Sequence, residues 1–135
     1  MAPIIKLKYK DEYLRNILST TKTIAMVGLS PEENRPSNFA AKYLQTKGYK
    51  IIPINPITTR KFILKEKVYP SLHYLNFKPD TIISTHNLEH IEDPLKLFKV
   101  LSNLVDNNGM IFIEVPDATT MIKNLRYDQI FHQHY

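Results

Sequence analysis

A continuous apolar run that ends at a glycine constrains this chain more than any other feature. Residues 24–27 read Ile-Ala-Met-Val, and Gly28-Leu29-Ser30 follow directly. An uninterrupted apolar strand is typical of a parallel sheet that helices cover on both faces. A helical pattern begins near Ser37, so the sequence predicts a strand, a turn and a helix in succession.

The predicted turn has the chemistry of an anion site. Gly28 has no side chain to block the close approach of an anion, and free N–H groups at the helix start near Ser37 face the same opening. The motif over residues 28–37, Gly-x-Ser-x-x-x-x-Arg-Pro-Ser, differs from the Gly-x-Gly-x-x-Gly of a dehydrogenase and the Gly-Lys-Ser/Thr of a nucleotide hydrolase. The sequence therefore predicts a phosphate-binding turn of another kind.

Helices and strands alternate along the chain. The expected helices cover residues 11–19, about 37–47 and the stretch after Asp93-Pro94; the expected strands cover residues 23–28, 50–55, 67–69, 81–85 and 110–115. This alternation predicts an α/β fold, namely a Rossmann-like, doubly wound, mainly parallel sheet of order 3-2-1-4-5 in a single domain over residues 1–135. A ligand is expected at the carboxyl ends of strands one and four, where the strand order reverses.

Each of the two longer helices has an apolar pattern that predicts its buried face. The first is expected to bury Phe39, Ala40, Tyr43 and Leu44, and to end at Gly48 as a C-terminal cap. The second is expected to begin at an Asp93 cap and to bury Leu95, Leu97, Phe98, Leu101 and Leu104.

Composition narrows the classes of function. The chain has no cysteine, which excludes disulfides, thiol nucleophiles and zinc–thiolate sites. No apolar run approaches the ~20 residues that span a bilayer. The first residues lack the pattern of a signal peptide, so a cytoplasmic protein without a membrane partner is expected. The net charge of +5 comes from scattered lysines and arginines without a recognition motif, so no nucleic-acid partner is expected.

Histidine and serine do not form a recognisable catalytic or metal site. His86 and His90 have metal-ligand spacing only on one helix face, and His132 and His134 only on one face of a strand. Neither pair has an identifiable third ligand. Ser30 lacks the Gly-x-Ser-x-Gly elbow of a hydrolase. No metal ligand and no catalytic residue is therefore predicted.

Several separated blocks resemble one protein family. They are the strand and turn at residues 23–30, Arg-Pro-Ser at 35–37, Tyr-Leu-Gln-Thr-Lys-Gly-Tyr at 43–49, Ile-Ile-Pro-Ile-Asn-Pro at 51–56 and Lys-Val-Tyr-Pro-Ser-Leu at 67–72. Over about residues 14–72 the chain resembles the CoA-binding domain family, small Rossmann-like domains related to the nucleotide-binding part of succinyl-CoA ligases. It departs from the family at Leu64-Lys65, where Leu-Gly is usual.

The resemblance implies CoA as the ligand, bound by Gly28, Leu29, Ser30, Arg35, Pro36, Ser37, Asn55, Pro56 and Thr85. The backbone amides of residues 28–30 and the Ser30 hydroxyl would receive the diphosphate, and Arg35 would add forked hydrogen bonds to a phosphate. Asn55-Pro56 would line the adenosine side, and Thr85 would lie at the end of strand four. The competing interpretation is that Ser30 and Ser37 only cap the turn and the helix, and that Arg35 is solvated.

The remaining residues resemble a second family. The blocks are Pro-Asp at 79–80, Leu-Glu-His-Ile-Glu-Asp-Pro at 88–94, residues 108–117 and the ending at 126–135. Residues 77–135 resemble the back half of class I S-adenosylmethionine-dependent methyltransferases, and their ending resembles C-methyltransferases that act on sugars. The chain would then consist of a CoA-binding-like half, 1–76, and a methyltransferase-like half, 77–135. Charge follows a similar division, because residues 1–79 hold 14 Lys+Arg against 5 Asp+Glu and residues 80–135 hold 4 against 8.

Two functions stay open at this point. S-adenosylmethionine needs a Gly-rich loop after strand one and an acidic residue at the end of strand two. Here strand two ends in Asn55-Pro56, and no Asp or Glu stands between Glu33 and Glu66. The favoured hypothesis is a Rossmann-like domain that binds CoA or an acyl-CoA, a small nucleotide-bearing molecule, without catalysis; no protein partner is predicted. The alternative is an S-adenosylmethionine-dependent C-methyltransferase, or a fragment of one.

Overall fold

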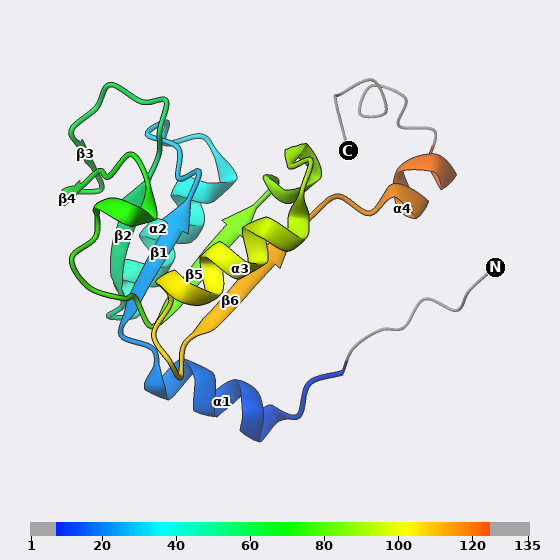
Figure 1. Cartoon of the computed structure of the whole chain (residues 1–135), viewed down its shortest axis with the longest axis horizontal. Coiled ribbons are helices and arrows are strands. Elements are labelled where there is room, and N and C mark those ends of the chain that lie inside the picture. The colour runs from blue at the N-terminus through cyan, green and yellow to red at the C-terminus, as the bar shows by residue number, and fades with distance from the viewer. Residues whose placement is uncertain (1–7, 125–135) are drawn as a thin grey trace.

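A computed structural model of the chain describes residues 8–124 (Figure 1). The helices are α1 (Asp11–Thr20), α2 (Pro36–Thr46), α3 (Pro94–Leu104) and α4 (Ala118–Lys123), with 3-10 turns at Leu72–Tyr74 and Leu88–His90. The strands are β1 (Thr23–Val27), β2 (Lys50–Ile54), β3 (Phe62–Ile63), β4 (Glu66–Lys67), β5 (Thr81–Thr85) and β6 (Met110–Glu114). The methyltransferase-like ending at 126–135, with His132 and His134, lies outside the described residues.

Four parallel strands form the central sheet in the order β2-β1-β5-β6. The chain moves from β1 to β2 on one side and then crosses back to β5 on the other. The strand order therefore reverses between β1 and β5. This topology confirms the predicted α/β, Rossmann-like fold with a parallel sheet flanked by helices.

The predicted five-strand order 3-2-1-4-5 is not confirmed, because residues 67–69 do not add a strand to this sheet. Tyr69 makes only an isolated parallel bridge to Ile54 at the sheet edge. Pro70 follows and has no N–H group with which a ladder could continue. The neighbouring residues instead form an antiparallel hairpin of β3 and β4.

Helices cover the sheet on opposite faces, and in Figure 1 α3 crosses in front of the sheet while α2 lies behind it. Alternate residues of β1 point to the two sides. Ile24 and Met26 join the core cluster that contains Ala41 of α2, and Ala25 joins the cluster that contains Leu101 of α3. Both faces of β1 are thus buried, as its continuous apolar sequence predicts.

The predicted buried face of α2 is wrong except for Leu44. The side chains of Phe39 and Tyr43 are 59% and 60% exposed, and Ala40 is exposed as well. The helix instead buries Ala41, whose small side chain allows close approach to the sheet, and Asn38. The Asn38 side chain is satisfied in the interior because its Nδ2 donates to the Ser30 carbonyl at 2.9 Å.

The predicted buried face of α3 is correct for three of its five residues. Leu101 is buried, and Leu97 and Leu104 pack against the same core cluster. Leu95 and Phe98 are exposed because their positions lie off this stripe of the helix.

No helix within the described residues combines the length and the apolar character that a membrane span requires.

The predicted helix ends are confirmed. Gly48 has a φ of +90°, and the amides of Gly48 and Tyr49 donate to the carbonyls of Gln45 and Leu44, the pattern of a Schellman cap. The Asp93 carboxylate accepts the Lys96 amide at the start of α3.

Candidate nucleotide-binding site

A cavity of about 660 Å³ lies at the carboxyl ends of β1, β2 and β5, where the strand order reverses. Seven of the nine residues implied by the family resemblance line it: Gly28, Ser30, Arg35, Pro36, Ser37, Asn55 and Thr85. The structure thus brings residues from three separate segments to one place. Ligands of open α/β sheets bind at this position, so we call it the switch-point cavity.

The other two residues do not line the switch-point cavity. The Leu29 side chain is fully buried in the core cluster on the α2 side of the sheet. Pro56 lines a separate apolar cavity on the α3 side. The Leu29 backbone helps to hold the loops beside the cavity, because its carbonyl accepts a hydrogen bond from the Asn55 side chain.

Two of the three amides expected to receive a diphosphate, those of Gly28 and Ser30, already donate a hydrogen bond within the protein. The Gly28 amide donates to the Ile54 carbonyl at 2.8 Å, and the Ser30 amide donates to the Ser37 hydroxyl at 3.1 Å. A backbone amide has one hydrogen to donate. These two hydrogen bonds therefore hold the turn in shape.

Three hydroxyl groups on the cavity wall accept a backbone amide. The Ser37 hydroxyl accepts the Ser30 amide, the Ser30 hydroxyl accepts the Glu32 amide at 3.2 Å, and the Thr58 hydroxyl accepts the Arg60 amide at 3.2 Å. A hydroxyl that accepts an N–H bond keeps its own hydrogen for another acceptor. The interpretation of Ser30 and Ser37 as turn-stabilising residues is therefore compatible with a ligand-binding role.

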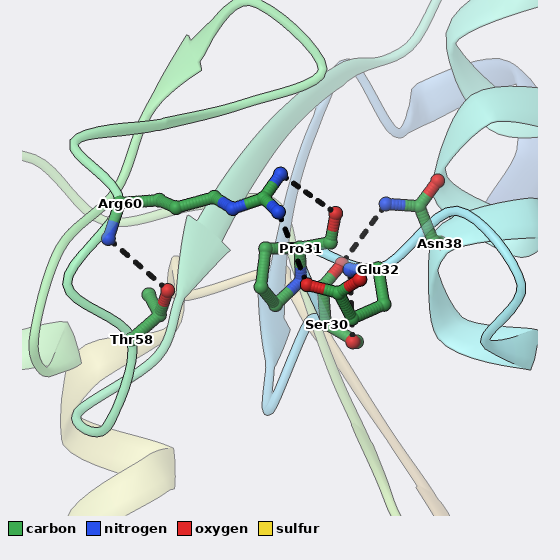
Figure 2. Close-up of polar contacts among 6 residues, drawn as sticks. All are labelled: Ser30, Pro31, Glu32, Asn38, Thr58 and Arg60. Atoms are coloured by element: carbon green, nitrogen blue, oxygen red, sulfur yellow. Dashed lines mark hydrogen bonds and ion pairs between the residues drawn. The ribbon is translucent and has the colours of Figure 1, made fainter.

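The two arginines near the cavity differ in their surroundings. Arg60 forms an ion pair with Glu32 at 3.1 Å and also approaches the Pro31 carbonyl at 3.4 Å (Figure 2). This contact links the loop after β2 to the loop after β1. Arg35 lines the cavity at the start of α2, and within residues 8–124 no carboxylate forms an ion pair with it. Arg35 is therefore the cation that remains available to an anion.

Asn55 fixes the geometry of two loops at once. Its Nδ2 donates to the Leu29 carbonyl at 3.0 Å, and its Oδ1 accepts the amides of Ile57 and Thr58 at 2.9 and 3.0 Å. The side chain thus positions Thr58 on the cavity wall. An asparagine in this place satisfies backbone groups that a hydrophobic residue would leave without partners.

Asn87 is a residue of the cavity that the sequence motifs do not identify. Its Nδ2 lies within 3.3 Å of three acceptors, namely the Val27 carbonyl, the Ser84 hydroxyl and the Thr85 carbonyl. It thereby ties the ends of β1 and β5 together. A Cβ atom at Gly28 would lie 3.2 Å from Asn87 Nδ2, so glycine also provides room for this side chain. The one feature of the sequence that could have identified Asn87 is its position just after the predicted strand 81–85.

A cluster of two histidines and two glutamates lies beside Asn87. The His86 ring is 3.6 Å from Glu89 and 3.8 Å from Glu114, and His90 is 3.9 Å from Glu89. The Glu89 side chain is largely buried, and its Oε2 has no hydrogen-bond partner among the described residues. No group of three or more potential ligands in this part of the chain could hold a metal ion.

An open parallel sheet, with a ligand-sized cavity and a helix start at its switch point, defines the class of Rossmann-like nucleotide-binding domains. The family can be named more closely. The chain belongs to the CoA binding domain family, whose model matches residues 22–121. The match extends past the 14–72 segment of the sequence resemblance and across the predicted division between residues 76 and 77. Membership implies a small-molecule ligand, CoA or a related nucleotide.

Curated relatives match only segments. The chain is 46% identical over 43 residues to an uncharacterized protein of Bacillus subtilis, YneT. The matched segment covers 32% of this chain and 32% of YneT. It is 37% identical over 46 residues to the C-methyltransferase NovU of Streptomyces niveus. The matched segment covers 34% of this chain and 11% of NovU. The chain therefore spans well under two thirds of both relatives, and the methyltransferase resemblance is a weak, partial match.

Solved structures match over most of the chain. A hypothetical protein from Pyrococcus horikoshii superposes with a TM-score of 0.56 at 24% identity, over 93% of this chain and 97% of that protein. A protein from Thermus thermophilus superposes with a TM-score of 0.57 at 21% identity, over 87% of this chain and 98% of that protein. These similarities support the fold.

Proposed function

We propose that this protein binds CoA in the switch-point cavity and that the binding is not coupled to catalysis. One observation carries the proposal: Arg35, without a carboxylate partner in the described residues, lines the same cavity as the hydroxyls of Ser30, Ser37 and Thr58. A guanidinium and several hydroxyl donors around one opening suit a multiply charged phosphate group. CoA carries such groups.

The wall of the cavity supports a diphosphate near the start of α2. Gly28, with a φ of +81°, lets the chain turn sharply without a side chain in the way. Pro36 stands at the first turn of α2, and the positive end of the helix dipole lies beside Ser37. The diphosphate would therefore accept hydrogen bonds from Arg35, Ser30 and Ser37.

The adenosine would lie toward the loop after β2. Ile57 lines the cavity and is 88% exposed, which offers an apolar surface to a flat base. Covering it would remove apolar surface from water. Asn55 would support this loop from behind through its bonds to the Ile57 and Thr58 amides.

Methyl transfer is the second candidate, and the partial match to NovU is the observation that favours it. The residues at the cavity favour CoA over S-adenosylmethionine. The loop after β1 holds one glycine, and the end of β2 carries Asn55, whose side-chain oxygen already accepts two backbone amides. A cytoplasmic location, and the absence of nucleic-acid and membrane partners, stay predictions.

Replacing Arg35 tests the proposal. Arg35→Ala should weaken CoA binding about tenfold to a hundredfold, the loss typical of hydrogen bonds to a charged group. Binding of adenosine, which has no phosphate, should change little. Arg15→Ala on α1 is the matched control, because it removes the same charge from an exposed helix that does not line the cavity. Equal losses for CoA and adenosine would contradict a phosphate-binding role for Arg35.

A further inference from the structure

A second cavity, of about 480 Å³, lies on the α3 side of the sheet at the carboxyl ends of β1 and β2. Val27 and Ile54 form its floor, and Leu97, Val100, Leu101 and Leu104 of α3 form one wall. We propose that this cavity binds the acyl chain of an acyl-CoA thioester, and we call it the acyl cavity. The inference rests on the proposed function, because the CoA portion would occupy the switch-point cavity.

Asn87 lines both cavities. Its Nδ2 is held by the ends of β1 and β5, so the side chain has a fixed place between the cavities. Its Oδ1 accepts no hydrogen bond from the described residues and is free to accept one from a ligand. The arm of CoA that carries the thiol contains amide N–H groups. An arm that leaves the switch-point cavity past Asn87 would therefore find an acceptor and then enter the acyl cavity.

The walls of the acyl cavity select an uncharged, aliphatic chain. Among the described residues that line it there is no Lys, Arg, Asp or Glu, and His73 is the only titratable side chain. A carboxylate at the end of the acyl group would lose its hydration without gaining a cation. Each methylene that the cavity covers should tighten binding about fourfold, since burial of one methylene contributes about 0.8 kcal/mol.

The test is a calorimetric titration of the full chain with CoA, acetyl-CoA, butanoyl-CoA, hexanoyl-CoA and octanoyl-CoA. We expect the Kd to fall by about an order of magnitude for each added pair of methylenes, until the chain fills the cavity. Succinyl-CoA should bind no more tightly than acetyl-CoA. Equal Kd values for CoA and for all acyl-CoAs would overturn the acyl cavity and leave the proposed function intact. No binding of CoA itself would overturn both.

Substitutions in the acyl cavity test whether the dependence of Kd on acyl-chain length arises there. Val100→Trp fills the cavity from α3 and should abolish the dependence on chain length while CoA itself binds as in the unmodified protein. Leu95→Trp is the matched control, because Leu95 lies on the same helix, is exposed and does not line the cavity. Ile91→Trp fills the cavity from the loop that precedes α3 and serves if Val100→Trp does not fold. An unchanged chain-length dependence in a folded Val100→Trp or Ile91→Trp variant would overturn the proposal. If one of these substitutions instead converts a dimer into monomers, the cavity is a contact between copies of the chain. That result would also overturn the proposed acyl cavity.

Discussion

The Ser37 hydroxyl accepts the backbone amide of Ser30 at 3.1 Å, and so ties the first turn of α2 to the turn that follows β1. Ser37 is not the N-cap of α2, since Arg35 holds that position without a side-chain cap bond. The hydroxyl therefore acts on the preceding turn rather than on the helix. Its hydrogen remains available at the wall of the switch-point cavity.

Ser37→Ala should weaken CoA binding about tenfold. The substitution removes one hydrogen-bond donor to a charged phosphate, and such a bond contributes about 1.5 kcal/mol or more. It also leaves the Ser30 amide without its acceptor. Ser37→Thr keeps the hydroxyl and should retain most of the affinity. Ser19→Ala is the control, because the Ser19 hydroxyl bonds only within α1. Unchanged affinity in Ser37→Ala, measured by calorimetry, would contradict the role assigned to this hydroxyl.

Lys65→Gly should stabilise the protein. Leu64 and Lys65 form the two-residue turn between β3 and β4 with φ values of +50° and +66°, a left-handed conformation that side chains disfavour. Relief of that strain at one residue is worth about 1 kcal/mol. The urea midpoint should rise accordingly, whereas Lys61→Gly, at a residue without a positive φ, should not raise it. A lower midpoint for Lys65→Gly would show that the lysine side chain stabilises the turn by another contact.

The sequence predicted those features of the fold that depend on a few neighbouring residues, namely helix caps and turns. Gly48 and Asp93 end and begin their helices as predicted, because caps depend on a few neighbouring residues. The unusual Leu64-Lys65 pair marks a position where the backbone is left-handed, which explains why a glycine is usual there.

The buried face of α2 could not be predicted in the same way. Phe39 and Tyr43 follow the spacing of a buried stripe, but the helix approaches the sheet through Ala41, and this orientation depends on the whole sheet. Thr58 and Asn87 were missed for a related reason. Both lie on loops whose course is set by distant contacts, such as the bond from Asn55 to Leu29 and those from Asn87 to the ends of β1 and β5.

Asp80 should make the stability of the protein depend on pH. Its Oδ2 accepts hydrogen bonds from the amides of Lys22 and Thr23 and from the Thr23 hydroxyl. Partial burial raises the pKa of Asp80, but the hydrogen bonds from Thr23 and Lys22 outweigh it and hold the pKa below its usual value. A lowered pKa in the folded state means that the stabilisation is present above the unfolded pKa of about 3.9 and is lost as the pH falls through the folded value.

The corresponding experiment compares unfolding of Asp80→Asn and the unmodified protein across acidic pH. The variant should be less stable at neutral pH, and the difference should shrink below about pH 4 as Asp80 of the unmodified protein takes up a proton. Glu92→Gln, at an exposed residue, should show no such convergence. A difference that stays constant with pH would mean that the charge of Asp80 does not contribute.

The most direct test of CoA binding is a pair of calorimetric titrations of the folded, purified chain, one with CoA and one with S-adenosylmethionine. Binding heat with CoA at a stoichiometry of one, and none with S-adenosylmethionine, is the predicted result. Heat with S-adenosylmethionine alone would contradict it, and would show that the single-glycine loop at Gly28 and the Asn55 end of β2 accept the methyl donor instead.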